Sequence, residues 1–406
     1  MSLKVAFFEP EPRGHHLALY ARNIFREGLR RGWQIRLITG KQAVEHPAYK
    51  MLAAEYGDQI SVTLIDDVIG VEKSSGFTKM KQQFARWKTY RAGYREVLRE
   101  FQPDVCYVNS LEKIDVPMGF WGSPFGRTPF SGLMILRHFH CKHMGIKTEP
   151  MGRADQILEW AFRRTLRVPL LRRLLVIDPL LAQYCRDFGL AKAEKVHFVP
   201  DLSSIAGRVD IADPRGELGI PKDLFVILNY GALSPRKGVE ESLAALVHPS
   251  CPPHVGVLLA GKQDADIEAT LSSDVARKLI EQKRLFAVNR YLDDREESLC
   301  FQAADAVWVG YKRFYGMSGV LVQSASSGLP VISSDEGLIA YLVEKEGLGV
   351  TTPIHEPEVV AHAIAKLVGM DRAEIAERSR KMAANHTPEL FAQRVCDHIE
   401  ATASGK

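Results

Sequence analysis

The chain has 406 residues, of which 46% are hydrophobic and 25% are charged, and this is the composition of a soluble globular protein with about two domains. No apolar run reaches the roughly 18 residues that a membrane-spanning helix requires, which argues against an integral membrane protein. The first residues lack the basic segment and long apolar core of a secretion signal, so a cytoplasmic location is expected.

Charge is divided unevenly between the two halves of the chain. Residues 1–200 contain 31 Lys and Arg against 20 Asp and Glu, whereas the remainder contains 22 against 29. The halves therefore carry net charges of +11 and −7, which predicts two domains with different surroundings and an anionic partner for the first. The six cysteines lie far apart without a Cys-x-x-Cys pair, so we expect reduced thiols rather than disulfides or a zinc site.

An N-terminal doubly wound domain is predicted over residues 1–200. Short apolar runs rich in β-branched and aromatic residues alternate there with helical patterns, as in a parallel sheet that helices cover on both sides. The predicted strands are residues 4–9, 34–39, 60–65, 105–109, 133–137, 174–177 and 196–200. The first strand leads into a turn at Gly14, where glycine allows close approach of the backbone to a ligand.

Two stretches of this domain concentrate positive charge. Residues 79–99 are interpreted as a solvated helical face. In the segment from Trp160 to Arg173, basic side chains are interleaved with aromatic residues and leucines, a pattern typical of a helix that lies on anionic lipid. This segment is predicted to bind an anionic membrane surface, with a solvated face as the alternative. Nucleic acid is not expected as a partner, because the whole chain carries only +4 and shows no recognised RNA or DNA motif.

A second domain is predicted over residues 225–385, after a linker at 201–224. Its predicted strands are residues 225–230, 255–260, 285–291, 306–311 and 330–333. Residues 386–406 are predicted to form a final helix that packs back across the domain boundary. Thr387 and Pro388 suit the cap and the first position of this helix.

Two loops that follow strands of the second domain have the composition of a phosphate site. Ligands of open parallel sheets bind beyond the carboxyl ends of the strands. After the first strand of this domain, Arg236 and Lys237 lie between two glycines and offer a planar guanidinium and a point charge. After residue 311, a small-residue turn leads through Ser318 and Gly319 into a helix, whose N-terminal N–H groups and dipole attract phosphate. The two loops together predict a diphosphate site, with solvated loop charges as the alternative.

Four motifs of this domain follow one another in a recognisable order. They are Gly231-x-Leu-x-x-x-Lys237-Gly238, Leu258-Leu-Ala-Gly261-Lys262, Ala303-Ala-Asp305-Ala and Gly319-Val-Leu-Val-Gln-Ser-Ala-Ser-Ser-Gly328-Leu-Pro330-Val-Ile. Over residues 225–345 their order and spacing resemble those of retaining family-four glycosyltransferases. The resemblance implies the GT-B fold, an α/β fold in which two Rossmann-like, doubly wound parallel-sheet domains face each other across a cleft. It also implies a nucleotide-sugar donor held mainly by the second domain, without a metal or a cofactor.

The resemblance assigns roles in donor binding. By position, Lys237 contacts the diphosphate beside Gly231, and a phosphate is bound by the backbone of Ser318, Gly319, Val320 and Leu321. From their place at the end of the strand predicted at 285–291, Tyr291 and Leu292 are expected to touch the nucleobase. The acidic run that follows, residues 293–297, is interpreted as ordinary first-turn charges of a helix rather than a metal site.

The chain departs from the family at three donor-site positions. Two glutamates that the family often carries fall on Tyr315 and Gln323, and its arginine falls on Ala232. The amide of Gln323 can still accept a hydrogen bond from ribose hydroxyls. Arg236, four residues further on, is expected to supply the missing cation.

The resemblance places the sugar and the acceptor against the N-terminal domain. Related enzymes carry a histidine after the strand predicted at 133–137, and we expect His140, or else His138, to orient the sugar. The loop of Arg13, Gly14, His15 and His16 resembles the family's glycine loop on the acceptor side, where a histidine orients an acceptor hydroxyl. Strand-end capping and a plain helix entry are the alternatives for these two groups.

The predicted activity is transfer of a hexose from a UDP- or GDP-sugar to a hydroxyl of a sugar or lipid-linked acceptor, with retention of configuration. Arg236, Lys237 and the N–H groups near Ser318 would stabilise charge on the leaving diphosphate. Glycolipid or polysaccharide synthesis at the inner membrane face is the expected setting. The alternatives are a sugar-nucleotide epimerase of the same fold and a catalytically degenerate nucleotide-sugar-binding subunit. A nicotinamide dehydrogenase is not expected, because no Gly-x-Gly-x-x-Gly follows either first strand.

Overall fold

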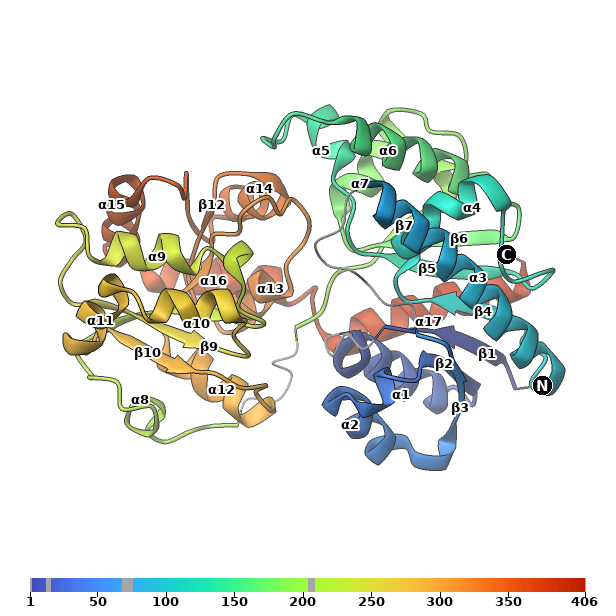
Figure 1. The fold of residues 1–406 in the computed structure, drawn as a ribbon, viewed down its shortest axis with the longest axis horizontal. Coiled ribbons are helices and arrows are strands. Elements are labelled where there is room, and N and C mark those ends of the chain that lie inside the picture. The colour runs from blue at the N-terminus through green and yellow to red at the C-terminus, as the bar shows by residue number, and fades with distance from the viewer. Residues whose placement is uncertain (1, 12–15, 68–75, 204–208, 406) are drawn as a thin grey trace. The chain divides into compact units, whose positions relative to one another are not determined.

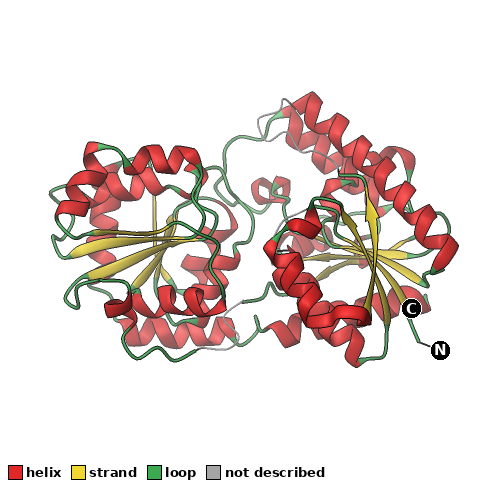
Figure 2. Ribbon diagram, turned by 60° about the horizontal axis from the view of Figure 1, so that its bottom comes forward, coloured by secondary structure: helices red, strands yellow, loops and turns green. Residues whose placement is uncertain are grey.

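A computed structural model describes residues 2–11, 16–67, 76–203 and 209–405, and the chain divides into two compact units (Figure 1). Unit 1 consists of Met1–Met144, Pro150–Pro200 and Pro388–Lys406. Unit 2 consists of Gly145–Glu149 and Asp201–Thr387, so the stretch 201–224 that was predicted as a linker is grouped with it. Each unit is a parallel sheet with helices on both faces, which confirms the predicted doubly wound fold (Figure 2).

Unit 1 is built on seven parallel strands in the order β3-β2-β1-β4-β5-β6-β7. The strands are β1 (Lys4–Phe8), β2 (Gln34–Gly40), β3 (Ile60–Ile65), β4 (Val105–Val108), β5 (Phe130–Met134), β6 (Leu171–Val176) and β7 (Val196–Phe198). The helices are α1 (Arg22–Arg30), α2 (Pro47–Tyr56), α3 (Gly76–Glu100), α4 (Asp115–Trp121), α5 (Phe139–His143), α6 (Arg153–Leu166), α7 (Pro179–Asp187) and α17 (Pro388–Ser404). Single helical turns are η1 (His16–Ala21), η2 (Ala43–Glu45), η3 (Gly57–Gln59), η4 (Leu111–Lys113) and η5 (Ala193–Lys195).

Strand β5 begins three residues before the predicted position, and this part of the prediction was wrong. Residues 130–134 pair with β4 and β6, whereas Ile135 lies beyond the sheet and donates its N–H to Glu112 Oε2 at 3.3 Å. The prediction missed the start of the strand because this part contains Gly132, a residue with low strand propensity. In the structure a side chain at this position would lie 2.9 Å from the Val108 carbonyl oxygen, so close strand packing requires the glycine.

Unit 2 is built on six parallel strands in the order β10-β9-β8-β11-β12-β13. The strands are β8 (Phe225–Tyr230), β9 (Val255–Ala260), β10 (Leu285–Val288), β11 (Ala306–Val309), β12 (Val331–Ser334) and β13 (Gly349–Thr352). The helices are α8 (Pro214–Glu217), α9 (Val239–Leu246), α10 (Ala265–Leu271), α11 (Asp274–Glu281), α12 (Asp294–Ala303), α13 (Gly319–Ser326), α14 (Gly337–Glu346), α15 (Pro357–Val368) and α16 (Arg372–Ala383), with one turn at η6 (Pro235–Lys237). Strand β13 was not predicted, because its sequence Gly-Val-Thr-Thr offers no apolar run.

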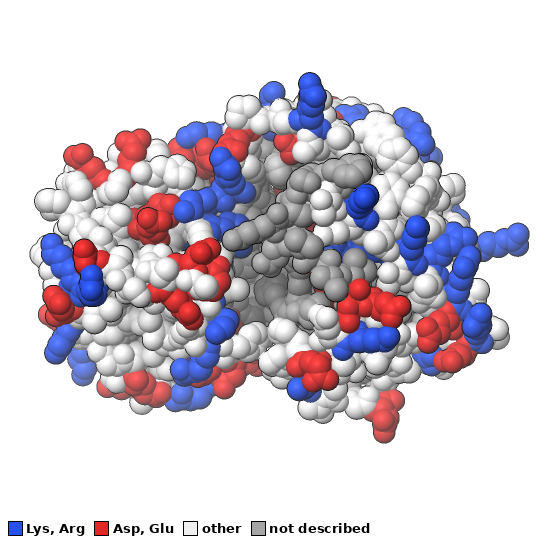
Figure 3. All heavy atoms as spheres, viewed as in Figure 1, with Lys and Arg blue, Asp and Glu red and all other residues white. Residues whose placement is uncertain are grey.

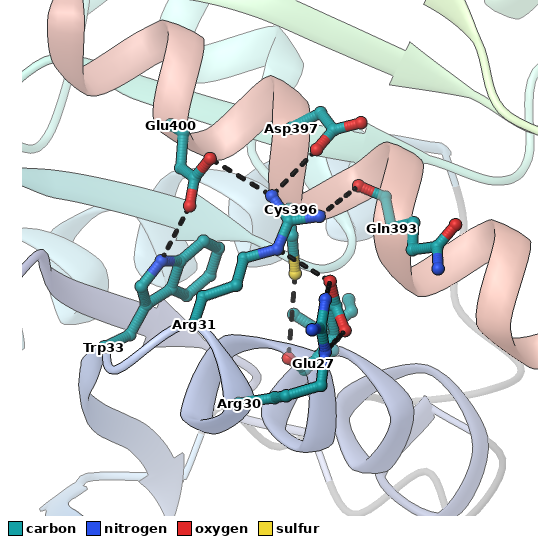
Figure 4. A network of polar contacts seen from close by, with 9 residues as sticks. Glu27, Arg30, Arg31, Trp33, Gln393, Cys396, Asp397 and Glu400 are labelled. Carbon is teal, nitrogen blue, oxygen red and sulfur yellow. Dashed lines mark hydrogen bonds and ion pairs between the residues drawn. The ribbon is translucent and has the colours of Figure 1, made fainter.

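Helix α17, from the end of the chain, belongs to the core of unit 1. It packs against α1 and strands β4, β5 and β6, and the side chains of Phe391, Val395 and Ile399 are completely buried. At its exposed side, the Arg31 guanidinium at the end of α1 binds the carboxylates of Asp397 and Glu400 (Figure 4). The last helix is therefore held by both apolar packing and ion pairs.

The topology of both sheets marks the same place for a ligand. Strand order reverses between β1 and β4 in unit 1 and between β8 and β11 in unit 2. Side chains that follow these strands converge at the carboxyl edge of the sheet, where ligands of doubly wound folds bind.

On the face shown in Figure 3, basic and acidic side chains are interspersed over both units. Within the described part of the chain, no helix has the length and apolar character needed to cross a membrane.

Candidate functional site

Lys237 lies at the switch point of unit 2, in the loop between β8 and α9. Its ammonium donates to the carbonyl oxygen of Tyr230 at 3.1 Å and to the hydroxyl of Tyr311 at 2.8 Å. The residue is only 7% exposed. Gly231 has a φ of +106°, and a side chain there would lie 3.4 Å from the Lys237 ammonium. Glycine at position 231 thus allows the turn and leaves room for the Lys237 ammonium, which the Tyr230 carbonyl oxygen and the Tyr311 hydroxyl hold in place.

Arg236 lies next to this ammonium and packs against aromatic rings of the loop after β11. Its guanidinium carbon is 4.8 Å from the centre of the Phe314 ring and 5.4 Å from that of Tyr311. Burial lowers the pKa of Arg236, but an arginine stays charged at neutral pH. These ring contacts restrict the guanidinium, whose planar fork of donors suits recognition of phosphate oxygens.

The N-terminus of α13 is joined to Lys237 through one tyrosine. Ser318, which precedes the helix, donates its hydroxyl hydrogen to the Tyr311 hydroxyl at 3.4 Å, and its side chain makes no capping bond to the helix. Gly319, Val320 and Leu321 form the first turn, which carries the positive end of the helix dipole; the Leu321 N–H already donates to the Ser318 carbonyl oxygen at 3.0 Å. The structure therefore brings together the two loops from which the diphosphate site was predicted. Tyr311 was missed as the link, because its spacing from Lys237 carries no sequence signal.

The nucleoside side of the predicted site contains a buried carboxylate. Gln323 of α13 donates from Nε2 to Glu297 Oε1 at 2.6 Å. Glu297 lies in the first turn of α12, as predicted, but it is buried at 6% exposure and contacts Gln323, so it is not an ordinary solvated first-turn charge. Burial and the neighbouring Glu297 raise the pKa of the Tyr230 hydroxyl well above its usual value. Tyr291, in the segment after β10 with Leu292, is 47% exposed.

Tyr315 occupies the position at which the family often carries a glutamate, and it has a structural contact. The hydroxyl accepts a hydrogen bond from the backbone N–H of Glu149 at 3.3 Å, and the residue is 7% exposed. The same short segment continues the contact, because the carbonyl oxygen of Lys147 accepts from the Gly337 N–H at 2.8 Å. Within unit 2, Tyr315 therefore connects residues 145–149 to the loop between β11 and α13.

In unit 1, His16 lies beside polar residues that follow β1 and β4. Its Nδ1 atom is 3.3 Å from Glu9 Oε2 and 3.1 Å from the Ser110 hydroxyl. Asn109 donates to the same Glu9 oxygen at 2.8 Å. The carboxylate can thus fix the orientation of the imidazole. The other members of the predicted acceptor loop, Arg13, Gly14 and His15, lie outside the described residues.

The two histidines predicted to orient the sugar have different environments. His140 is completely buried, and its Nε2 atom is 2.8 Å from Asp178 Oδ2. Asp178 also caps α7 by accepting from the N–H of Leu180 at 2.8 Å. The side chain of His138 is 40% exposed, and its Nε2 atom is 3.3 Å from Asp155 Oδ1. Because His140 is completely buried, it could contact a sugar only if neighbouring residues moved, whereas the side chain of His138 is already accessible to solvent. The roles of both histidines in sugar binding stay predictions.

No group of three or more His, Cys, Asp or Glu that could hold a metal ion occurs among the described residues. The six cysteines are all buried as free thiols.

Comparison with known proteins finds one matching family and several solved structures of similar fold. Residues 210–386 match the family described as glycosyl transferases group 1. No curated protein sequence matches the chain. Among solved structures, sucrose-phosphate synthase from Thermosynechococcus elongatus superposes with a TM-score of 0.73 at 16% identity, covering 100% of both chains. HepE from Anabaena, solved with UDP and glucose, gives a TM-score of 0.67 at 17% identity and covers 98% of this chain and 100% of its own. WaaG, a glycosyltransferase involved in lipopolysaccharide biosynthesis, gives 0.63 at 16% identity, with 97% and 99% covered. These likenesses show that the chain has the GT-B fold.

Proposed function

We propose that the protein transfers a hexose from a nucleoside diphosphate sugar to an acceptor hydroxyl with retention of configuration; the match of residues 210–386 to the glycosyl transferases group 1 family supports this proposal. One observation carries the proposal: the Tyr311 hydroxyl joins the Lys237 ammonium to Ser318 at the N-terminus of α13. A cation and a helix N-terminus thus lie together beyond the carboxyl ends of β8 and β11. Both attract the negative charges of a diphosphate. UDP is the favoured nucleotide, since HepE binds UDP and UDP-glucose.

The site stabilises the leaving group of the proposed reaction. When the bond between the anomeric carbon and the diphosphate oxygen breaks, negative charge builds on that oxygen. Lys237, Arg236 and the N–H groups of the first turn of α13 are held in position before the charge develops, so little reorganisation is needed. These groups take the part that a metal ion plays in other transferases, and we propose that the reaction is metal-independent.

The acceptor is proposed to bind to unit 1 through His16, whose imidazole Glu9 orients. With retention of configuration, the acceptor oxygen attacks the face that the diphosphate leaves. Its proton then passes to the departing phosphate oxygen, so no side chain has to act as a base. His138 or His140 would orient the sugar.

Nucleotide binding is the first test of this function. Among UDP, GDP and ADP, one diphosphate, with UDP favoured, is expected to raise the thermal unfolding midpoint, because a ligand at 100 times its Kd adds about 2.7 kcal/mol of stability. The matching sugar nucleotides are then incubated with sugar and lipid-linked acceptors, and mass spectrometry follows the donor and the products. An isomerised donor without any acceptor would indicate an epimerase, and binding without turnover a binding subunit. Absence of binding by all three nucleotides would overturn the proposal.

Unit 1 offers an exposed aromatic surface that suits a lipid-linked acceptor or the membrane around it. Phe120 and Trp121 at the end of α4 are 58% and 47% exposed, and Trp160 of α6 is 40% exposed. The ring centres of Phe120 and Trp160 are 4.8 Å apart. A shallow hollow of about 560 Å³ lies between α3, α4 and α6, lined by Met80, Phe120, Arg153, Gln156, Ile157 and Trp160. We call these six residues and Trp121 the α4–α6 patch.

Cations accompany the α4–α6 patch. The Arg164 guanidinium is 5.6 Å from the Trp160 ring centre, and the Lys88 ammonium is 6.0 Å from that of Trp121. The segment predicted for lipid contact, Trp160 to Arg173, is exposed only in part, because Leu166 and Leu171 are fully buried. We therefore propose that anionic lipid binds the N-terminal part of this segment together with the end of α4, as a peripheral contact.

Sedimentation with vesicles tests the lipid contact. Vesicles that contain anionic phospholipid are expected to carry the wild-type protein down at low salt, and neutral vesicles are not. Trp160→Asp should reduce the bound fraction several-fold, because it removes an aromatic anchor and adds a repelled charge. Ile280→Asp is the matched control, since Ile280 is an exposed aliphatic residue of unit 2, 51% accessible. Equal sedimentation of Trp160→Asp and wild type would contradict the proposed surface.

A further inference from the structure

We propose that Trp308 is a positioning residue for the reaction, which holds the backbone of Lys237 so that its ammonium meets the diphosphate. The inference rests on the function proposed above and assigns a role in it to a side chain of the core. Trp308 would act through Lys237, because its indole N–H binds the main chain of that residue.

Trp308 connects the core of unit 2 with the loop between β8 and α9. It is the third residue of β11, its side chain is completely buried, and it belongs to the same apolar cluster as Val239 and Leu243 of α9. From there the indole Nε1 donates to the carbonyl oxygen of Lys237 at 2.8 Å. Tryptophan combines a large apolar surface with one N–H donor. A residue of the packed core thereby fixes the point from which the Lys237 side chain begins.

Two glycines make room for the indole ring. A side chain at Gly310 would lie 2.4 Å from Trp308 Cζ2, and one at Gly238 would lie 3.1 Å from Trp308 Nε1. The backbone therefore approaches the ring closely from both of the loops that carry the candidate phosphate site. Because protein interiors are close-packed, a ring enclosed in this way cannot shift far. The indole thus holds the Lys237 carbonyl in a defined place.

Further contacts join the same two loops. The Arg236 carbonyl oxygen accepts from the backbone N–H of Lys312 at 2.8 Å. The ammonium of Lys312 lies 2.7 Å from Glu241 Oε1 in the first turn of α9. The carbonyl groups of both cationic residues, Arg236 and Lys237, are therefore held from β11 and the segment that follows it, and Trp308 is the contact that lies within the core.

The Lys237 side chain is held at both ends. Trp308 fixes its main chain, while the Tyr311 hydroxyl and the Tyr230 carbonyl oxygen bind its ammonium at 2.8 and 3.1 Å. A charged group is most effective when it is in place before charge develops on the leaving group. A shift of about 1 Å in a positioned group can cost about 100-fold in rate. Loss of the indole bond should therefore reduce turnover although the ammonium itself remains.

Trp308→Phe tests this role by removing the N–H and keeping a planar apolar ring. Turnover is measured with UDP-glucose, or with the sugar nucleotide and acceptor that the nucleotide-binding test identifies. We expect kcat to fall about tenfold, while KM for the donor and the calorimetric Kd of UDP stay within about twofold of the wild-type values. Benzothienylalanine at position 308 replaces the N–H by sulfur and keeps the size of the ring system. It should give the same loss of turnover, and it serves where the smaller ring of Trp308→Phe prevents folding.

A double-mutant cycle with Lys237→Ala shows whether Trp308 acts through the ammonium. Lys237→Ala keeps the carbonyl oxygen that Trp308 binds, so the structural part of the Trp308→Phe change is the same in both backgrounds. If Trp308 positions the ammonium, adding Trp308→Phe to Lys237→Ala should lower kcat by less than about twofold. Tenfold losses in both backgrounds would show a general effect on the fold and overturn the inference.

Trp33→Phe is the matched control in unit 1. Trp33 is 5% exposed, and its Nε1 atom donates to Glu400 Oε1 at 3.0 Å (Figure 4). This variant also loses a buried indole donor, so its unfolding midpoint should fall while kcat stays within about twofold. A tenfold loss of kcat in Trp33→Phe, or wild-type turnover in Trp308→Phe, would overturn the inference and leave the proposed function standing. If the wild-type protein turned over no sugar nucleotide, the proposed function and the inference would fall together.

Discussion

Replacement of Lys237 by Ala is expected to lower the turnover of sugar transfer by about 100- to 1,000-fold, the range seen when one preorganised charge-stabilising donor is removed. The ammonium is already fixed by the Tyr230 carbonyl and the Tyr311 hydroxyl, so its contribution grows as charge builds on the departing diphosphate. Binding of the donor in its ground state should suffer less than turnover. The signature is thus a fall in kcat that exceeds the rise in KM.

The stability of the Lys237→Ala variant has to be measured alongside its kinetics. The change leaves a buried carbonyl and a buried hydroxyl without one donor, at a cost of about 1–3 kcal/mol. Calorimetric unfolding should show a folded protein with a modestly lower midpoint. Lys278→Ala, on the exposed surface of α11, is the control and should retain full activity. Wild-type turnover in Lys237→Ala would refute the diphosphate site.

Gly238→Ala is expected to destabilise unit 2 by about 2–4 kcal/mol and to impair donor binding. Gly238 has a φ of +67°, and a side chain there would lie 2.2 Å from the Gly310 carbonyl oxygen and 3.1 Å from Trp308 Nε1. Trp308 is fully buried and donates to the Lys237 carbonyl oxygen at 2.8 Å. The backbone at Lys237 and Gly238 therefore cannot shift to accommodate a side chain without disturbing β11.

Gly219→Ala provides the comparison for this variant. Gly219 has a φ of +66°, but a side chain there would meet no atom within 4 Å. It reports the cost of the left-handed backbone alone, roughly 1 kcal/mol. Urea unfolding and UDP titration of both variants separate conformational strain from the clash. Equal stabilities of the two variants would show that the loops after β8 and β11 are not packed as described.

The strands of both sheets were largely predictable, because buried parallel strands are apolar on both faces. Prediction failed where that signal is weak, at Gly132 inside β5 and in the polar edge strand β13. The candidate phosphate loops could also be found, since glycines and adjacent cations follow a strand directly. Contacts between distant residues carried no such signal. The enclosure of His140 by Asp178 and the inward turn of Glu297 depend on helix packing that a single sequence does not reveal.

Helix α17 has a consequence for the order in which the chain matures during synthesis. The ribosome makes the strands of unit 1 before those of unit 2, but the helix whose Phe391, Val395 and Ile399 complete the core of unit 1 follows both. The main part of unit 2, Asp201–Thr387, leaves the ribosome in between and contains all the strands of its sheet. Nascent unit 1 therefore keeps an uncovered apolar surface beside α1 until α17 has been synthesised. Unit 1 can therefore complete its core only after unit 2 has been made.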